Sequence, residues 1–185
     1  MIFVKGEGIH MEFKELIKER RSVRAYQEGK SISDDIIREI IEDALLAPSW
    51  KNYETSRFYV ANTPERIEKV RACMPSFNQK STANASYIIT TYVKDTSGFT
   101  AGNPDNELGN KWGAYDLGLS NAYLILAAKD RGLDTLILGL RDSVELRKAL
   151  DIPKTEQIAA IIAIGYGAKE PVLGARKSID EVAHF

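Results

Sequence analysis

Histidine and cysteine are scarce in this sequence of 185 residues. The 2 histidines, His10 and His184, lie near opposite ends of the chain, so no imidazole is available between them as a base or a metal ligand. Cys73 is the single cysteine, which excludes an internal disulfide and any multi-cysteine metal site. These absences exclude Ser-His-Asp and Cys-His catalysis and most zinc chemistry. They favour a reducing, cytoplasmic location.

An excess of charge and long apolar runs are also missing. Lys and Arg number 25 and Asp and Glu 26, so the chain offers no basic surface and we expect no nucleic-acid partner. The longest apolar runs, Tyr123 to Ala128 and Ile158 to Ile164, fall short of the roughly 20 residues that cross a bilayer. We therefore expect no membrane span.

The first residues differ in character from the rest. Residues 1–10 lack the basic-then-apolar order and the cleavage site of a signal peptide. We interpret them as a loose leader, with Met11 as an alternative start. Residues 11–185 are then predicted to form one domain, because a chain of this length and ordinary composition builds one buried core.

Apolar periodicity predicts a mixture of helices and strands. Helical spacing of apolar residues covers residues 12–20, and a second helix begins after Ser33 as N-cap and stops at Pro48. Further helices are expected from Pro64 to about Cys73, over residues 111–131 and, with Ser143 as N-cap, up to Leu150. Strands are expected at residues 57–61, 87–93, 135–138 and 158–164. Residues 74–84 are expected to be irregular, and 97–110 to be a mobile loop. Without strict βαβ alternation, the order favours an α+β layered domain.

The helix predicted from Lys111 to Arg131 has almost no polar face. A helix that is apolar nearly all round is buried, either at the centre of a domain or in an oligomer interface. Gly132 is the expected end of this helix.

Three segments carry side chains that suit a bound ligand. If the chain is extended after the first helix, Arg20, Ser22 and Arg24 share one face, which suits a phosphate and a polyol. The sharp turn at Pro48-Ser49-Trp50, followed by Asn52, could bind a planar heteroaromatic ring. Near the end, Arg176 and Lys177 could reach an anion. The alternatives are a solvated basic helix end, a helix stop with a buried Trp, and solvated tail charges.

One glycine pair does not qualify as a nucleotide motif. Gly165-Tyr166-Gly167 follows a predicted strand, but the third glycine of a dinucleotide fingerprint is missing. Pro171 also opposes a following helix, so no Rossmann domain is expected.

Taken in order, four segments resemble the nitroreductase family of flavoproteins. They are Arg-Arg-Ser-Val-Arg-Ala-Tyr from Arg20, Ala-Pro-Ser-Trp-Lys-Asn from Ala47, the end of the apolar helix at Gly132-Leu133-Asp134-Thr135, and the closing Arg-Lys-Ser-Ile-Asp-Glu-Val-Ala-His-Phe. The resemblance covers residues 13–185. It implies a layered α/β/α fold and an intertwined homodimer, with the long apolar helix at its centre.

The resemblance also implies the site. FMN phosphate and ribityl groups would be held by Arg20, Arg21, Ser22 and Arg24, with Arg176 and Lys177 from the tail. The isoalloxazine ring would face Pro48, Ser49, Trp50 and Asn52 from the other subunit. Asn78 matches a flavin contact, Lys80 matches a family lysine that aligns nearer Ser81, and Leu138 and Gly139 match a turn whose amides face the ring. No catalytic side chain and no metal are implied, because the flavin carries the chemistry.

The implied activity is transfer of electrons from NADH or NADPH, through FMN, to a small acceptor such as a nitroaromatic or a quinone by a ping-pong mechanism. Where many members have Gln-Pro-Trp, this chain has Glu54, Thr55 and Ser56, and the glutamate would bring a negative charge to that end of the site. Two alternatives remain: a flavin-binding homodimer without redox turnover, and a flavin dehalogenase of the same fold.

Overall fold

The computed structural model describes residues 12–185, so the leader predicted at residues 1–10, Met11 and His10 lie outside the described residues. The helices are α1 (Phe13–Glu19), α2 (Asp34–Leu45), α3 (Pro64–Ala72), α4 (Ser76–Ser81), α5 (Lys111–Asp130) and α6 (Ser143–Ala149), with short 3-10 turns η1 (Trp50–Asn52) and η2 (Ile179–Glu181). The strands are β1 (Ser56–Ala61), β2 (Ser86–Val93), β3 (Phe99–Thr100), β4 (Asn103–Pro104), β5 (Asp134–Leu138) and β6 (Glu156–Gly165).

Four strands form one antiparallel sheet in the order β1-β2-β6-β5. The two inner strands are buried along most of their length, as their runs of Ile and Ala require. In register, Ile88 of β2 pairs with Ile162 of β6, and Ile162 pairs in turn with Ile137 of β5. All four predicted strands are therefore confirmed, and their antiparallel pairing is a finding that the sequence pattern does not specify.

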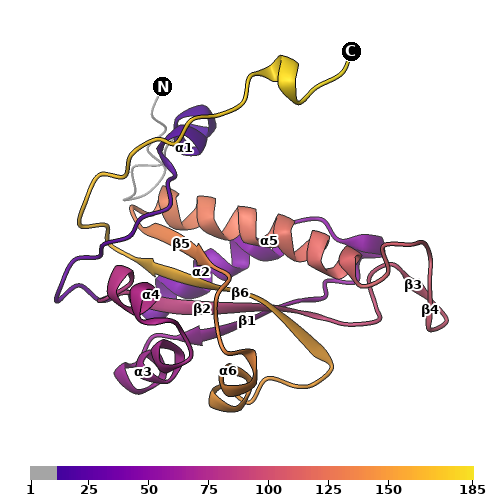
Figure 1. Cartoon of the computed structure of the whole chain (residues 1–185), viewed down its shortest axis with the longest axis horizontal. Coiled ribbons are helices and arrows are strands. Elements are labelled where there is room, and N and C mark those ends of the chain that lie inside the picture. Colours follow the sequence, from indigo (N-terminus) through magenta and orange to yellow (C-terminus); the bar gives the residue numbers. More distant parts are fainter. Residues whose placement is uncertain (1–11) are drawn as a thin grey trace.

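Helices cover both faces of this sheet, which gives three layers (Figure 1). On one face, Ile37 and Ile40 of α2 and Leu124 of α5 pack in a core cluster with Ile88 and Ile162. On the other face, α3 and α6 pack against the alternate residues of the same strands through a second cluster that includes Val70, Leu146, Tyr87, Ile89 and Leu136. Because successive side chains of a strand point to opposite faces of the sheet, each strand contributes to both core clusters. The layered α/β/α fold expected from the sequence is confirmed.

The predicted helix ends have identifiable causes. The Ser33 hydroxyl accepts a hydrogen bond from the Ile36 N–H, which satisfies one free donor at the start of α2. Thr63 does the same for α3, where Pro64 occupies the first turn. Gly132 follows α5 with a φ of 74°, a conformation that glycine adopts without strain.

Residues 74–84 are not irregular throughout, so that expectation was wrong. They contain α4, a helix without an apolar stripe, which is why periodicity missed it. Side-chain hydrogen bonds hold it in place: Gln79 Nε2 donates to the Met74 carbonyl at 2.8 Å, and Thr82 Oγ1 donates to the Asn78 carbonyl at 2.8 Å.

Two smaller expectations also need correction. Residues 97–110 include the hairpin of β3 and β4, whose turn residues Ala101 and Gly102 both have positive φ, as a type I′ turn requires. The N-cap of α6 is Asp142 rather than Ser143, because Asp142 Oδ1 accepts from both the Val144 and Glu145 N–H groups.

Several apolar side chains remain exposed in the single chain. Helix α1 lies where it was predicted, but Phe13 is 65% exposed and the helix contains no buried residue. On α5, Tyr115 is 59% and Tyr123 is 43% exposed. The tail after β6 runs past α1 and away from the sheet (Figure 1). Among residues 12–185, no helix is long and apolar enough to cross a membrane.

Candidate functional site

The segment after α1 is fixed against the sheet. Ser22 forms a parallel bridge with Thr135 of β5, and the Val23 N–H donates to the Thr135 carbonyl at 3.1 Å. Val23 is 1% exposed, as expected for the residue between Ser22 and Arg24, which are both exposed. The strand β5 therefore sets the positions of the polar residues on this segment.

The guanidinium groups of Arg21 and Arg176 lie close enough to that of Arg20 to affect its pKa. The pKa of Arg20 is lowered first by burial and then by the charges of Arg21 and Arg176. Within residues 12–185, no carboxylate forms an ion pair with any of these three. The tail and the segment after α1 thus bring positive charges together. The alternative interpretation, a helix end with solvated charges, would leave these charges apart. Lys177, next in the tail, is exposed.

A cavity of about 330 Å³ lies between α4 and the end of β5. Four of the predicted site residues line it, namely Arg24, Asn78, Leu138 and Gly139. Phe77, Ser81, Leu136, Ile137 and Leu140 complete the lining. Two larger hollows, of about 440 and 530 Å³, contain none of the predicted residues except Arg21 in the first.

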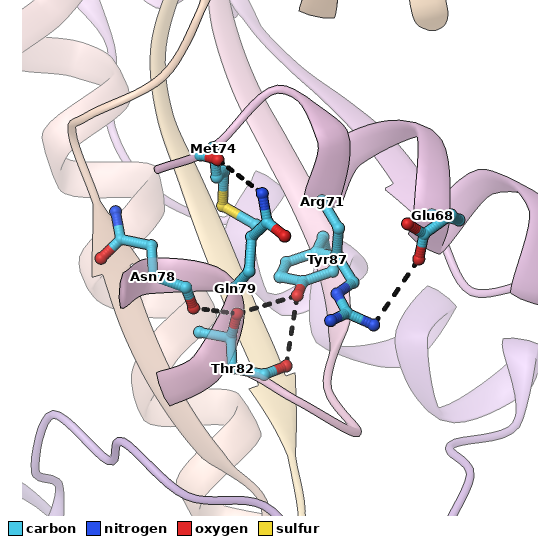
Figure 2. A network of polar contacts seen from close by, with 7 residues as sticks. All are labelled: Glu68, Arg71, Met74, Asn78, Gln79, Thr82 and Tyr87. Atoms are coloured by element: carbon cyan, nitrogen blue, oxygen red, sulfur yellow. Dashed lines mark hydrogen bonds and ion pairs between the residues drawn. The ribbon is translucent and has the colours of Figure 1, made fainter. Parts of the chain in front are cut away.

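Asn78 contributes a polar group to this cavity. It is buried, and its backbone carbonyl accepts the Thr82 hydroxyl, which in turn contacts the Tyr87 hydroxyl at 2.8 Å. Figure 2 shows the Asn78 side chain pointing away from this network. Its amide makes no hydrogen bond within residues 12–185, so it can offer one donor group and one acceptor to a ligand.

Gly139 leaves room in the same cavity. Its φ is not positive, and a Cβ placed on it would meet no atom within 4 Å. Neither backbone conformation nor packing within the chain therefore requires glycine here. A flat ligand that approaches the backbone closely would require it. By contrast, a Cβ on Gly165 or Gly167 would clash with Tyr26 or Asp134, so those two glycines serve packing. No α-helix follows Gly167 in the described chain, and the segment after it leads only to the short 3-10 turn η2, which agrees with the exclusion of a dinucleotide fingerprint.

The turn after α2 lies elsewhere on the single chain. None of Pro48, Ser49, Trp50 and Asn52 lines the cavity. The turn is held instead near the start of α5, where the buried carboxylate of Asp116 accepts the Trp50 N–H at 3.0 Å. Lys51 and Asn52 have φ of 48° and 56°. This left-handed backbone conformation is sparsely populated by residues other than glycine, and the surrounding contacts hold the turn in it.

This turn also contacts the hairpin of β3 and β4. Lys51 Nζ donates to Thr100 Oγ1 at 3.1 Å and lies 3.8 Å from Asp105 Oδ2. The rings of Trp50 and Trp112 pack against each other at an interplanar angle of 48°, with centroids 4.6 Å apart. Glu54, which replaces the common glutamine, accepts a hydrogen bond from Asn52 Nδ2 at 2.9 Å.

Sequence reasoning missed part of the cavity wall. Phe77 and Ser81 escaped because their helix was not predicted. Lys80 is exposed and does not line the cavity, and Ser81 occupies the place nearer to it. Arg141 was also missed: its guanidinium donates to the Gly139 carbonyl at 2.6 Å, directly behind the predicted turn. Nothing in the sequence pattern around a single arginine after a strand predicts such a hydrogen bond. Within residues 12–185, no cluster of His, Cys, Asp and Glu could hold a metal ion.

Comparison with known proteins gives one consistent result. The family model described as the nitroreductase family matches residues 17–166. YdgI of Bacillus subtilis, named as an NAD(P)H nitroreductase, is 28% identical over 204 aligned residues, which cover 94% of this chain and 97% of the relative.

Solved structures share the fold. An NAD(P)H:FMN oxidoreductase from Staphylococcus epidermidis superposes with a TM-score of 0.84 at 22% identity, covering 97% of this chain and 99% of that one. A nitroreductase in complex with FMN from Exiguobacterium sibiricum superposes with a TM-score of 0.82 at 22% identity, covering 95% and 97%. Because the family model spans most of the sequence and the fold agrees, this chain belongs to the nitroreductase family.

Proposed function

We propose that this chain is an FMN-dependent oxidoreductase that carries electrons from NADH or NADPH to a small acceptor such as a quinone or a nitroaromatic compound. The observation that carries the proposal is the cavity lined by Arg24, Asn78 and Gly139. Arg24 belongs to the segment after α1, and the same segment brings Arg20 close to Arg176. Supporting it are the FMN in the Exiguobacterium structure and the NAD(P)H in the name of the Bacillus relative.

The cationic segment fits the phosphate end of FMN. A dianion placed among Arg20, Arg21 and Arg176 would offset the burial and the two neighbouring positive charges that together lower the pKa of Arg20. Arg24, Ser22 and Lys177 extend the same set toward the ribityl chain. Each hydrogen bond between such charged groups contributes about 1.5 to 3 kcal/mol, so a few of them suffice for tight binding.

The cavity fits the ring end. Asn78 has an amide without a hydrogen-bond partner among residues 12–185, and the turn at Leu138 and Gly139 leaves open backbone against which a flat ring can lie. Lys80 remains an exposed cation on the same short helix. Bound FMN would supply the redox chemistry, taking a hydride equivalent from the nicotinamide and passing electrons to the acceptor. The chain's own residues bind and orient, and both substrates would use the same open face in turn.

The functional unit in this proposal is an intertwined homodimer of one domain per chain. Exposed residues of α5 recur three and four positions apart, which places Ala114, Tyr115, Gly118, Ala122 and Tyr123 on one apolar face. A second copy packed there would bury it and would cover the exposed apolar residues of α1. Pro48, Ser49, Trp50 and Asn52 would then complete the ring site of the partner, since they do not reach the cavity of their own chain.

Initial-rate kinetics test this function. Without oxygen, we expect the FMN-loaded protein to oxidise one equivalent of NADH or NADPH per flavin when no acceptor is present, and to turn over repeatedly only when a quinone or nitroaromatic acceptor is added. Double-reciprocal plots at several acceptor concentrations should be parallel, because reductant and acceptor occupy the same place in turn. Intersecting lines would contradict the shared place, and no oxidation with any acceptor would contradict the oxidoreductase assignment.

A further inference from the structure

Arg141 holds two separate pieces of backbone at the end of β5. Its Nη1 donates to the Gly139 carbonyl at 2.6 Å, and its Nη2 donates to the Ile158 carbonyl at 2.7 Å. Burial lowers the pKa of the guanidinium. In the described part of the chain no carboxylate pairs with it. The side chain is half-buried, and a partly desolvated cation without a paired carboxylate is costly, so the position of this arginine has to be explained.

The bond to Ile158 has a structural explanation. Strand β5 ends at Leu138, which pairs with Ile161, while β6 extends back to Glu156. The Ile158 carbonyl therefore lies beyond the last residue of β5. The Arg141 side chain supplies the donor that a longer strand would have supplied.

The bond to Gly139 fixes the orientation of a peptide group between two residues that line the cavity. The peptide between Gly139 and Leu140 is trans, so its C=O and N–H point in opposite directions. The carbonyl points to the guanidinium, and the Leu140 N–H consequently points away from it. Both residues line the cavity, and the Leu140 N–H makes no hydrogen bond within residues 12–185.

We propose that Arg141 is a positioning residue: it orients the Gly139–Leu140 peptide so that the Leu140 N–H is a fixed donor to the heterocyclic ring of the flavin. This inference rests on the proposed function, because it needs the flavin ring in this cavity. A preorganised donor stabilises negative charge that develops on the ring during reduction, and a nearby cation without a paired carboxylate acts in the same direction. Arg141 therefore favours both binding and reduction of FMN.

Arg147 provides a matched control. Its guanidinium also bonds backbone carbonyls, those of Ile152 at 3.1 Å and Glu156 at 2.9 Å, together with that of Pro153. It lies on α6 and does not line the cavity. Removing it tests what the loss of a backbone-binding arginine does to the fold alone.

The experiment compares Arg141→Met and Arg147→Met with the wild-type protein. FMN affinity is measured by quenching of flavin fluorescence, the midpoint potential of the bound flavin by equilibration with a reference dye, and apoprotein stability by urea unfolding. We expect Arg141→Met to weaken FMN binding about tenfold or more, a loss of about 1.4 kcal/mol. Its midpoint potential should shift to a lower value. Arg147→Met should change affinity less than about twofold and leave the potential unchanged.

A second pair of variants removes the donor itself, in case Arg141→Met does not fold. Leu140→Pro lacks the N–H while Arg141 stays in place, and Leu140→Ala keeps it. Leu140→Pro should lower affinity and potential more than Leu140→Ala does. Equal affinity and potential in Arg141→Met and wild type, or equal losses in Arg141→Met and Arg147→Met, would overturn the inference. If wild type itself binds no FMN, the proposed function fails instead.

Discussion

Asp116 accepts the backbone N–H of Trp50 at 3.0 Å, and the same carboxylate oxygen accepts the Ser97 hydroxyl at 2.6 Å. Asp116 is 3% exposed, so its charge is compensated by these donors rather than by water. One carboxylate on α5 thereby joins the turn after α2 to the start of the hairpin segment. This junction determines where the proposed partner-facing residues lie.

Removing that carboxylate should loosen the turn. We expect Asp116→Ala to lower the free energy of unfolding by about 1 to 3 kcal/mol, because it leaves buried donors without acceptors. Ser97→Ala removes one donor and keeps the bond to Trp50, so its loss should be smaller. Urea unfolding of the apoproteins measures both. Equal stability of Asp116→Ala and wild type would contradict the role assigned to the junction.

A side chain at Gly139 should affect the ligand and not the fold. A Cβ there meets no atom of the described residues within 4 Å, so Gly139→Ala should change the free energy of unfolding of the apoprotein by no more than about 0.5 kcal/mol, and the bulkier Gly139→Val is the stronger steric test of the ligand. Gly139→Val should weaken FMN binding at least about tenfold, and Gly139→Ala should weaken it less. Fluorescence titration checks the order. Unchanged affinity in both variants would place the ring elsewhere.

A charge on the apolar face of α5 should separate the subunits. Ala122 is exposed on that face, and Ala72 is an exposed alanine on α3, away from it. We expect Ala122→Glu to give a monomer and to lose FMN, because a lone chain lacks the partner's turn. Ala72→Glu should remain a dimer. Light scattering after size exclusion measures the mass, and a dimeric Ala122→Glu would contradict the proposed interface.

Alkali should weaken the fold through Tyr59. Burial, reinforced by its 2.9 Å hydrogen bond to Glu156, raises the pKa of Tyr59 from 10.0 to about 12. A raised pKa means that the folded state holds the proton more tightly, so this stabilisation is complete below pH 10.0 and is lost as the pH rises to about 12. Wild type should therefore lose more stability over that interval than Tyr59→Phe. Parallel stability curves for the two proteins, from urea unfolding at each pH, would contradict it.

The sequence predicts those elements whose stability has local causes. Ser33 and Pro64 mark helix starts because a cap and a fixed φ act within one turn. The runs of Ile in β2 and β6 mark inner strands because both faces of such strands are covered. Helix α4 could not be predicted in this way, since its bonds join Gln79 and Thr82 to backbone groups and leave no apolar pattern.

The candidate site likewise contains residues that the sequence predicts and residues that depend on tertiary contacts. The resemblance supplied Arg24, Asn78 and Gly139, and the structure brings these three to one cavity. Arg141 depends on where β5 ends relative to β6, which is a tertiary relation that no spacing in the sequence encodes. The proposed part of the turn at Ser49 in a ring site depends on a second copy of the chain, and a single sequence contains no geometry for that contact.

The measurement that tests the central claim most directly is the visible absorption spectrum of the purified protein with FMN, before and after NADH or NADPH is added without oxygen. We predict flavin bands that stay with the protein through gel filtration and bleach when the nicotinamide is added. A protein that retains no flavin after reconstitution would contradict the site. Retained flavin that neither nicotinamide bleaches would contradict the oxidoreductase function while leaving the cavity as a binding site.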